Sequence, residues 1–226
     1  MNYKRLLALF WEFAGKLEAV HAFYLDSLLG YSVIHERVLK HQDNMRDFLG
    51  ADHELATAEF QDTCSTIYKH LGGKDRAPVS LSPVMKQGDV KQRVKDNGQN
   101  TQLLGKQCVV DLYSYWEEYL RIEIGKALNV LTKDAERNGQ TREILNKHVK
   151  SDLWGDIKHI RNSIVHNNGV ATSEITRCKI MKWFKPGEAI ELNEERMHQI
   201  FLNLGRFRNE LHNLSLPPRK PIRLPG

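Results

Sequence analysis

A long run of apolar residues at helical spacing, near the start of the chain, is the feature that most limits how this sequence can fold. Between residues 3 and 48, large apolar side chains recur every three or four positions. They are Leu6, Phe10, Phe13, Leu17, Val20, Tyr24, Leu28, Tyr31, Ile34 and Val38. This spacing puts them on one face of an α-helix. The run exceeds an ordinary globular helix, so it predicts either one very long helix or two helices with a kink.

The aromatic-rich face of this region needs a cover. Three parts could pack against this face: the next helix, which is predicted over about 53–71; the C-terminal part of the chain; or a second copy of the chain. Gly72-Gly73 ends the second helix, and the residues that follow are rich in Gly, Pro, Lys and Asp without apolar periodicity. We therefore predict an N-terminal helical region over 1–72 and a linker or loop over 73–100.

The remainder of the chain predicts an all-α domain over 101–214. Its helices are expected over about 101–131, 141–149 and 153–167, and from Asn193 to the end of the domain. Two short apolar segments, 180–184 and 189–192, flank a Pro-Gly turn and predict a small β-hairpin before the last helix. Residues 215–226 are rich in proline and basic residues, so we expect an extended arm there.

Composition narrows the class of protein. Hydrophobic residues make up 41% of the 226 residues, which is enough for a folded core. Cys64, Cys108 and Cys178 are widely separated, so neither a disulfide framework nor a metal site is predicted, and no cofactor is expected. The N-terminus makes a poor signal peptide and no apolar stretch is long enough to span a membrane, so we expect a soluble, cytoplasmic protein. The formal charge of +5 suits an anionic partner such as RNA.

A polar strip on the helix predicted over 153–167 is the candidate site. At 100° per residue, Arg161 lies at the edge of an isoleucine cluster, while Asn162 and His166 lie on the far side, one turn apart. Asn162 is therefore expected to orient His166. These residue types suit metal-independent cleavage of RNA, because a histidine can take the proton of the 2′-hydroxyl and a guanidinium can hold two phosphoryl oxygens.

The spacing alone does not select this pair. Four places in the chain have an arginine followed, after four to six residues, by a histidine, and composition predicts roughly two by chance. They are Arg46/His53, Arg142/His148, Arg161/His166 and Arg206/His212. Only Arg161/His166 follows an isoleucine stripe and precedes an Asn-Asn-Gly stop.

The segment DLWGDIKHIRNSIVHNNG resembles the HEPN superfamily, in which an Arg-polar-x-x-x-His motif lies on a core helix. Arg161, Asn162 and His166 match that motif position by position. Two flanking segments, LYSYWEEYLRIEI and WFKPGEAIEL, resemble the family as well, and the likeness covers about residues 101–214. It implies a helical bundle that acts as a homodimer, often as a metal-independent endoribonuclease in toxin–antitoxin or antiphage systems. The arginine and histidine would come from both subunits, and an antitoxin or regulatory protein would be a further partner.

Two more residues could support such a site, and each has an ordinary structural explanation. Glu117 could act on the histidine, although its spacing from Arg121 favours a simple ion pair within one helix. Asn167 could contact the site, although its position favours a helix cap. The alternative function is a non-catalytic HEPN scaffold that binds RNA, nucleotides or another protein.

Overall fold

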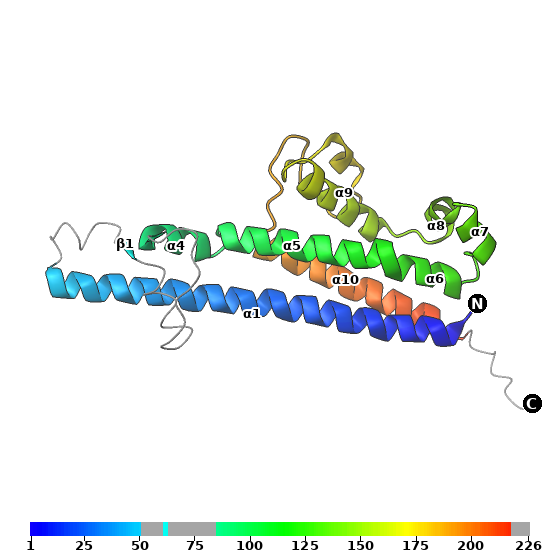
Figure 1. Ribbon diagram of the computed structural model, residues 1–226, viewed down its shortest axis with the longest axis horizontal. Coiled ribbons are helices and arrows are strands. Elements are labelled where there is room, and N and C mark those ends of the chain that lie inside the picture. The colour runs from blue at the N-terminus through cyan, green and yellow to red at the C-terminus, as the bar shows by residue number, and fades with distance from the viewer. Residues whose placement is uncertain (51–60, 63–84, 218–226) are drawn as a thin grey trace, which may run out of the picture. The chain divides into compact units, whose positions relative to one another are not determined.

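The computed structural model describes residues 1–50, 61–62 and 85–217, and these residues are mostly helical (Figure 1). The helices are α1 (Tyr3–Leu49), α4 (Gln87–Val94), α5 (Gln99–Tyr115), α6 (Arg121–Ala127), α7 (Lys133–Arg137), α8 (Thr141–His148), α9 (Asp152–His166) and α10 (Glu194–Ser215). Two shorter helical turns are η1 (Trp116–Leu120) and η2 (Ser173–Arg177). The only described sheet pairs two two-residue strands, β1 (Gln61–Asp62) and β2 (Met85–Lys86). The predicted all-α class is confirmed.

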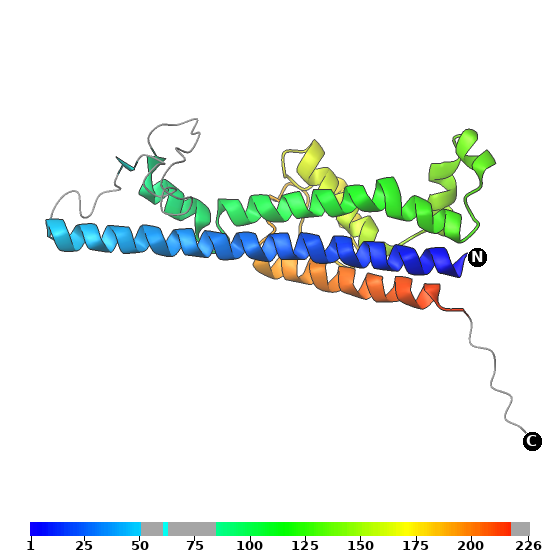
Figure 2. The ribbon, with the colours of Figure 1, turned by 60° about the horizontal axis from the view of Figure 1, so that its bottom comes forward.

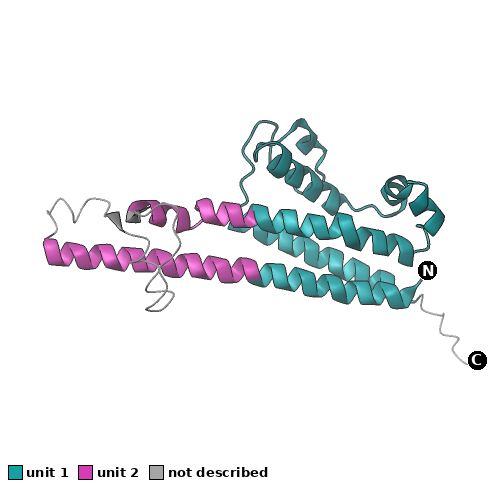
Figure 3. Cartoon of the chain, in the orientation of Figure 1, with its two compact units in different colours: residues 1–22, 106–226 teal, residues 23–105 magenta. Residues whose placement is uncertain are grey.

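The chain divides into two compact units (Figure 3). Unit 1 contains residues 1–22 and 106–226, and unit 2 contains residues 23–105. This division differs from the boundary predicted within 73–100, because the first 22 residues pack with the C-terminal part of the chain. The long apolar run forms one continuous helix, α1, as the first of the two predicted alternatives has it.

Unit 2 corrects the predicted linker. Residues Gln87–Val94 form α4, because Val90 and Val94 lie one turn apart and are both buried. Gly98 then permits the turn into α5, since a side chain there would lie within 3 Å of backbone carbonyl oxygens such as that of Arg93. Most of the helix predicted over 53–71 lies outside the described residues, but Gln61–Asp62 is a strand.

Aromatic side chains from four helices form the centre of unit 1. Trp116 and Trp154 stack in parallel, with ring centroids 4.8 Å apart. Phe207 of α10 meets both indoles edge-on, at 5.4 and 5.7 Å, and Phe13 of α1 lies 6.2 Å from Trp154. Such pairs add about 0.5–1.5 kcal/mol each to the burial of the rings. The cluster fixes α9 against the unit-1 parts of α1 and α5 and against α10, which lie side by side in two views (Figures 1 and 2).

The helix predicted over 101–131 is interrupted by a π-helical turn. The N–H of Arg121 donates to the carbonyl of Trp116, five residues back, so η1 contains one more residue per turn than an α-helix. Trp116 and Leu120, at the two ends of the turn, are buried. The turn therefore seats Trp116 against Trp154 without ending the helix.

Local signals in the sequence set both ends of α9. The hydroxyl of Ser151 accepts a hydrogen bond from the N–H of Trp154 at 3.5 Å and caps the start of the helix. At the other end, Asn168 and Gly169 have left-handed backbone angles, and the N–H of Gly169 donates to the carbonyl of Ser163. His166 is consequently the last residue of the helix.

The β-hairpin predicted around the Pro-Gly turn is wrong in its pairing. The turn itself forms, with the N–H of Glu188 donating to the carbonyl of Lys185 at 3.1 Å. However, Ala189 pairs with Val170, which follows α9, and not with the segment 180–184. The residues that follow α9 thus pair with the segment 189–192, which was expected to pair with the segment 180–184.

Asp156 explains why the segment 180–184 does not form the first strand of the predicted hairpin. Asp156 is 2% exposed, and its carboxylate accepts three backbone hydrogen bonds, from the N–H groups of Lys179, Ile180 and Met181, at 2.8, 2.7 and 2.7 Å. These donors are held against α9 and are not free to pair with residues 189–192. A buried carboxylate is stable only with such compensation.

We predict that Asp156→Ala destabilises the protein by about 3 kcal/mol, because it leaves three buried or half-buried N–H groups without an acceptor. Urea denaturation followed by circular dichroism would measure the loss. Asp152→Ala is the matched control, since Asp152 lies on the same helix but is exposed and pairs only with Lys179. Equal losses in the two variants would contradict this account of Asp156.

Candidate functional site

The candidate site lies at the C-terminal end of α9, where the structure brings its three predicted residues together. Nη1 of Arg161 lies 2.9 Å from Nε2 of His166 and 3.2 Å from Oδ1 of Asn162. His166 is exposed, and Arg161 and Asn162 are half-buried. The expected contact between Asn162 and His166 is not observed. The long side chain of Arg161 instead reaches both residues and bridges them.

The contact defines the chemical state of the imidazole. A guanidinium has only donors, so Nε2 of His166 must accept the hydrogen bond. The imidazole in this arrangement is therefore neutral, with its proton on Nδ1. Nε2 carries the lone pair that a general base needs. The guanidinium of Arg161 donates a hydrogen bond to this lone pair, which becomes available only when the guanidinium binds another group.

Tyr113 supports the arginine from beneath. The guanidinium carbon of Arg161 lies 5.8 Å from the centre of the Tyr113 ring, which favours a cation over its face. Tyr113 is 7% exposed, and this burial, together with the nearby Glu117 carboxylate, raises the pKa of its hydroxyl to about 12. The sequence placed Tyr113 on a buried helix face, but no spacing rule relates it to Arg161.

Lys106 brings a further cation to the end of α9. Gly169 has φ +76°, and a Cβ atom added there would lie 3.2 Å from Nζ of Lys106. The ammonium group thus lies beside Gly169, in the turn that follows His166. Helical periodicity gave no reason to single out this lysine, because its neighbour Gly169 is far away in the sequence.

The two proposed supporting residues serve the surrounding structure. Asn167 is the C-cap of α9, and its Nδ2 donates to the carbonyl of Val170 at 2.8 Å. Glu117 forms the expected ion pair with Arg121, at 3.1 Å. The same guanidinium also donates to the carbonyl of Val149 and to Oδ1 of Asn146.

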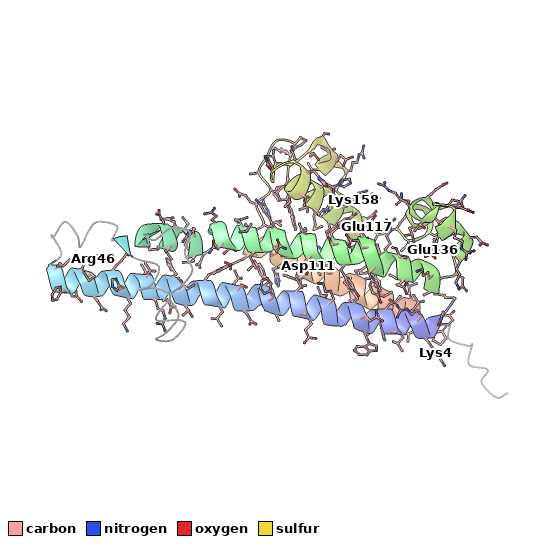
Figure 4. All side chains as sticks on the ribbon, in the orientation of Figure 1. Lys4, Arg46, Asp111, Glu117, Glu136 and Lys158 are labelled. Carbon is pink, nitrogen blue, oxygen red and sulfur yellow. The ribbon has the colours of Figure 1, made fainter. Side chains whose placement is uncertain are left out.

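A cavity of about 300 Å³ opens between η1 and the first half of α9, and Tyr113 is part of its wall. We call it the π-turn cavity. Its walls include Tyr113, Glu117, Trp154, Lys158 and His159. Glu117 of η1 and Lys158 of α9, both labelled in Figure 4, line it from the two helices.

His159 is half-buried in the wall of this cavity. Its Nδ1 atom lies 3.7 Å from a carboxylate oxygen of Glu174. Burial lowers the pKa of the imidazole, and Glu174 opposes this effect only in part. His159 is therefore kept neutral over a wider pH range than a solvated histidine.

Among the described residues, no group of three or more His, Cys, Asp or Glu side chains could hold a metal ion. None of the helices searched in that part of the chain is long and apolar enough to cross a membrane. Comparisons with protein-family models, curated proteins and solved structures find no match to this chain. The function must therefore be argued from the residues themselves.

We predict that His159 makes the protein less stable in mild acid. Because its pKa is lower in the folded protein than in the unfolded chain, the unfolded chain binds the proton first, and stability falls as the pH drops below about 6.5. His159→Leu should flatten the dependence of unfolding free energy on pH between about 7 and 5, by at most about 1.4 kcal/mol per pH unit. His148→Leu, at an exposed position, should leave the slope unchanged. Identical slopes for wild type and His159→Leu would refute the assignment.

Proposed function

We propose that this protein is a metal-independent endoribonuclease of the HEPN type, with Arg161 and His166 as catalytic residues. The observation that carries the proposal is the 2.9 Å contact between Nη1 of Arg161 and Nε2 of His166 at an accessible helix end. It joins a strong binder of phosphate oxygens to a neutral imidazole, the pair that cleavage of RNA without metal requires. The resemblance of residues 101–214 to HEPN domains adds to this support.

The chemistry follows from these two groups. RNA binding draws the Arg161 guanidinium from His166 to the non-bridging phosphoryl oxygens, where it stabilises the charge of the transition state. Nε2 of His166 then takes the proton of the 2′-hydroxyl, and the 2′-oxygen attacks phosphorus. The bond to the 5′-oxygen breaks, leaving a 2′,3′-cyclic phosphate, and a protonated histidine donates the proton that this oxygen needs. Asn162 holds Arg161 through its Oδ1 atom or contacts the phosphate.

A homodimer supplies the second histidine in this scheme. The α9 helix of one chain offers His166 alone at the site, so a symmetric partner is the simplest source of a general acid. Val165 and Val170, on either side of His166 in the sequence, are 45% and 37% exposed. Apolar side chains at the rim of a polar site suit a contact between two copies of the chain.

The setting that the resemblance suggests is toxin–antitoxin or antiphage defence in the cytoplasm. An antitoxin or regulatory protein would then restrain the nuclease. Expression of the wild type should arrest growth, whereas expression of His166→Ala should not.

We predict that His166→Ala abolishes cleavage of RNA in EDTA, with a loss of at least about 100-fold, because no other group takes the 2′-hydroxyl proton. Gel analysis of a labelled RNA would show it, and circular dichroism would verify the fold. His148→Ala is the control, since His148 is exposed at the end of another helix and also follows an arginine at similar spacing. Undiminished cleavage by His166→Ala would rule out the mechanism.

The alternative is a scaffold that binds RNA without cutting it. One observation favours it: Arg161 is already engaged by His166, Asn162 and the ring of Tyr113, as a purely structural arginine would be. In that case the wild type cuts no RNA, and Arg161→Ala weakens RNA binding while His166→Ala leaves it nearly unchanged. Under the nuclease proposal, Arg161→Ala reduces both binding and cleavage.

A further inference from the structure

Helix α1 carries a second apolar stripe, on the side opposite to its buried residues. At 100° per residue, the stripe falls within an arc of about 80°, roughly opposite buried side chains such as Phe13 and Leu17. Its large members are all exposed: Leu7 (39%), Trp11 (65%), Leu25 (49%), Leu29 (66%) and Val33 (37%). The outward side of a surface helix is normally polar, so an apolar stripe there marks a contact with a partner. We call it the outer stripe.

The other members of the outer stripe are small, apart from one acidic residue. Gly15 and Ala22 are exposed, and a Cβ atom added at Gly15 would meet no other atom within 4 Å. Glu18, also exposed, is the acidic member. The side chains at a contact set how closely two helices approach, so small ones let a second helix come near. A helix is therefore the element that fits the outer stripe.

The order of residues along the outer stripe matches that of a second α1 in the antiparallel direction. If two copies meet midway between Glu18 and Ala22, Trp11 faces the partner's Leu29. Gly15 then faces the partner's Leu25, a small residue against a large one. In a parallel pair in register, Glu18 would face the partner's Glu18, and like charges in contact oppose association. The antiparallel arrangement avoids this repulsion.

Charges beyond the two ends of the outer stripe support the same arrangement. Lys4, labelled in Figure 4, and Glu36 lie in the same arc of α1, and both are exposed. Neither forms an ion pair within the described part of the chain. In the antiparallel pair, Lys4 faces the partner's Glu36, and symmetry repeats the contact at the other end. The interface thus has an apolar centre and a charged rim, as protein interfaces commonly do.

We propose that the outer stripe of α1 is an interface between two copies of this chain, whose α1 helices pack antiparallel. The paired stretch, residues 7–33, is about 40 Å long at 1.5 Å per residue. Trp11 contributes most to it, since large aromatic side chains that become buried at an interface dominate its binding energy. The pairing does not rest on the proposed function, because Arg161 and His166 belong to α9.

The first test measures self-association of the full-length protein by sedimentation equilibrium. Trp11→Glu and Leu29→Glu should each raise the dissociation constant of the pair at least about tenfold, because each puts a charge into its apolar centre. Phe23→Glu is the matched control, since Phe23 is 56% exposed on the same helix but lies outside the arc of the outer stripe. It should associate as the wild type does, and circular dichroism would verify the helix content of each variant.

A second test exchanges the charges at the rim and reads the direction of pairing. At low salt, Lys4→Glu and Glu36→Lys should each raise the dissociation constant about fivefold, because each places like charges opposite each other. The double variant restores opposite charges and should recover the wild-type value. The proposal is overturned if the wild type is a monomer, which would mean that another protein or another part of the chain covers the stripe. It is equally overturned if Trp11→Glu and Phe23→Glu associate alike, or if the double variant does not recover.

Discussion

The stack of Trp116 on Trp154 is the contact on which unit 1 depends. It joins η1 to α9 at 4.8 Å, and Phe207 and Phe13 bring α10 and α1 to the same point. Because the two rings stack in parallel at close range, the contact holds α9 against η1. Arg161 meets the ring of Tyr113 as a result of that alignment. The packing of the core therefore determines that Tyr113, a residue of another helix, lies beside Arg161.

Much of the fold could be predicted, because helix periodicity and caps are local. The stripe in α1 and the Asn-Asn-Gly stop both appear where the sequence placed them. The two errors have different causes. The large apolar residues of α4 are Val90 and Val94, and two such residues are too few to show a clear helical period. The hairpin failed because Asp156 captures three N–H groups from the segment that was expected to pair.

The candidate site, too, could be predicted only in part from the sequence. Arg161, Asn162 and His166 lie within six consecutive positions of one helix, so their proximity could be deduced from its geometry. What the sequence could not give is which of them touch: Arg161, and not Asn162, contacts His166. Tyr113 and Lys106 come from α5, and no local rule links α5 to α9.

The π-helical turn in η1 makes the site sensitive to chain length. A π turn holds one residue more than an α turn, so loss of one residue within Trp116–Leu120 would restore a regular helix. Every side chain on one side of the change would then rotate by about 100° about the axis relative to the other side. Trp116 or the Arg121 guanidinium would leave its partners, while the composition of the helix would hardly change. Insertions and deletions are usually tolerated in loops. Here, a change of one residue in the middle of a helix would displace the side chains that form the core and the site.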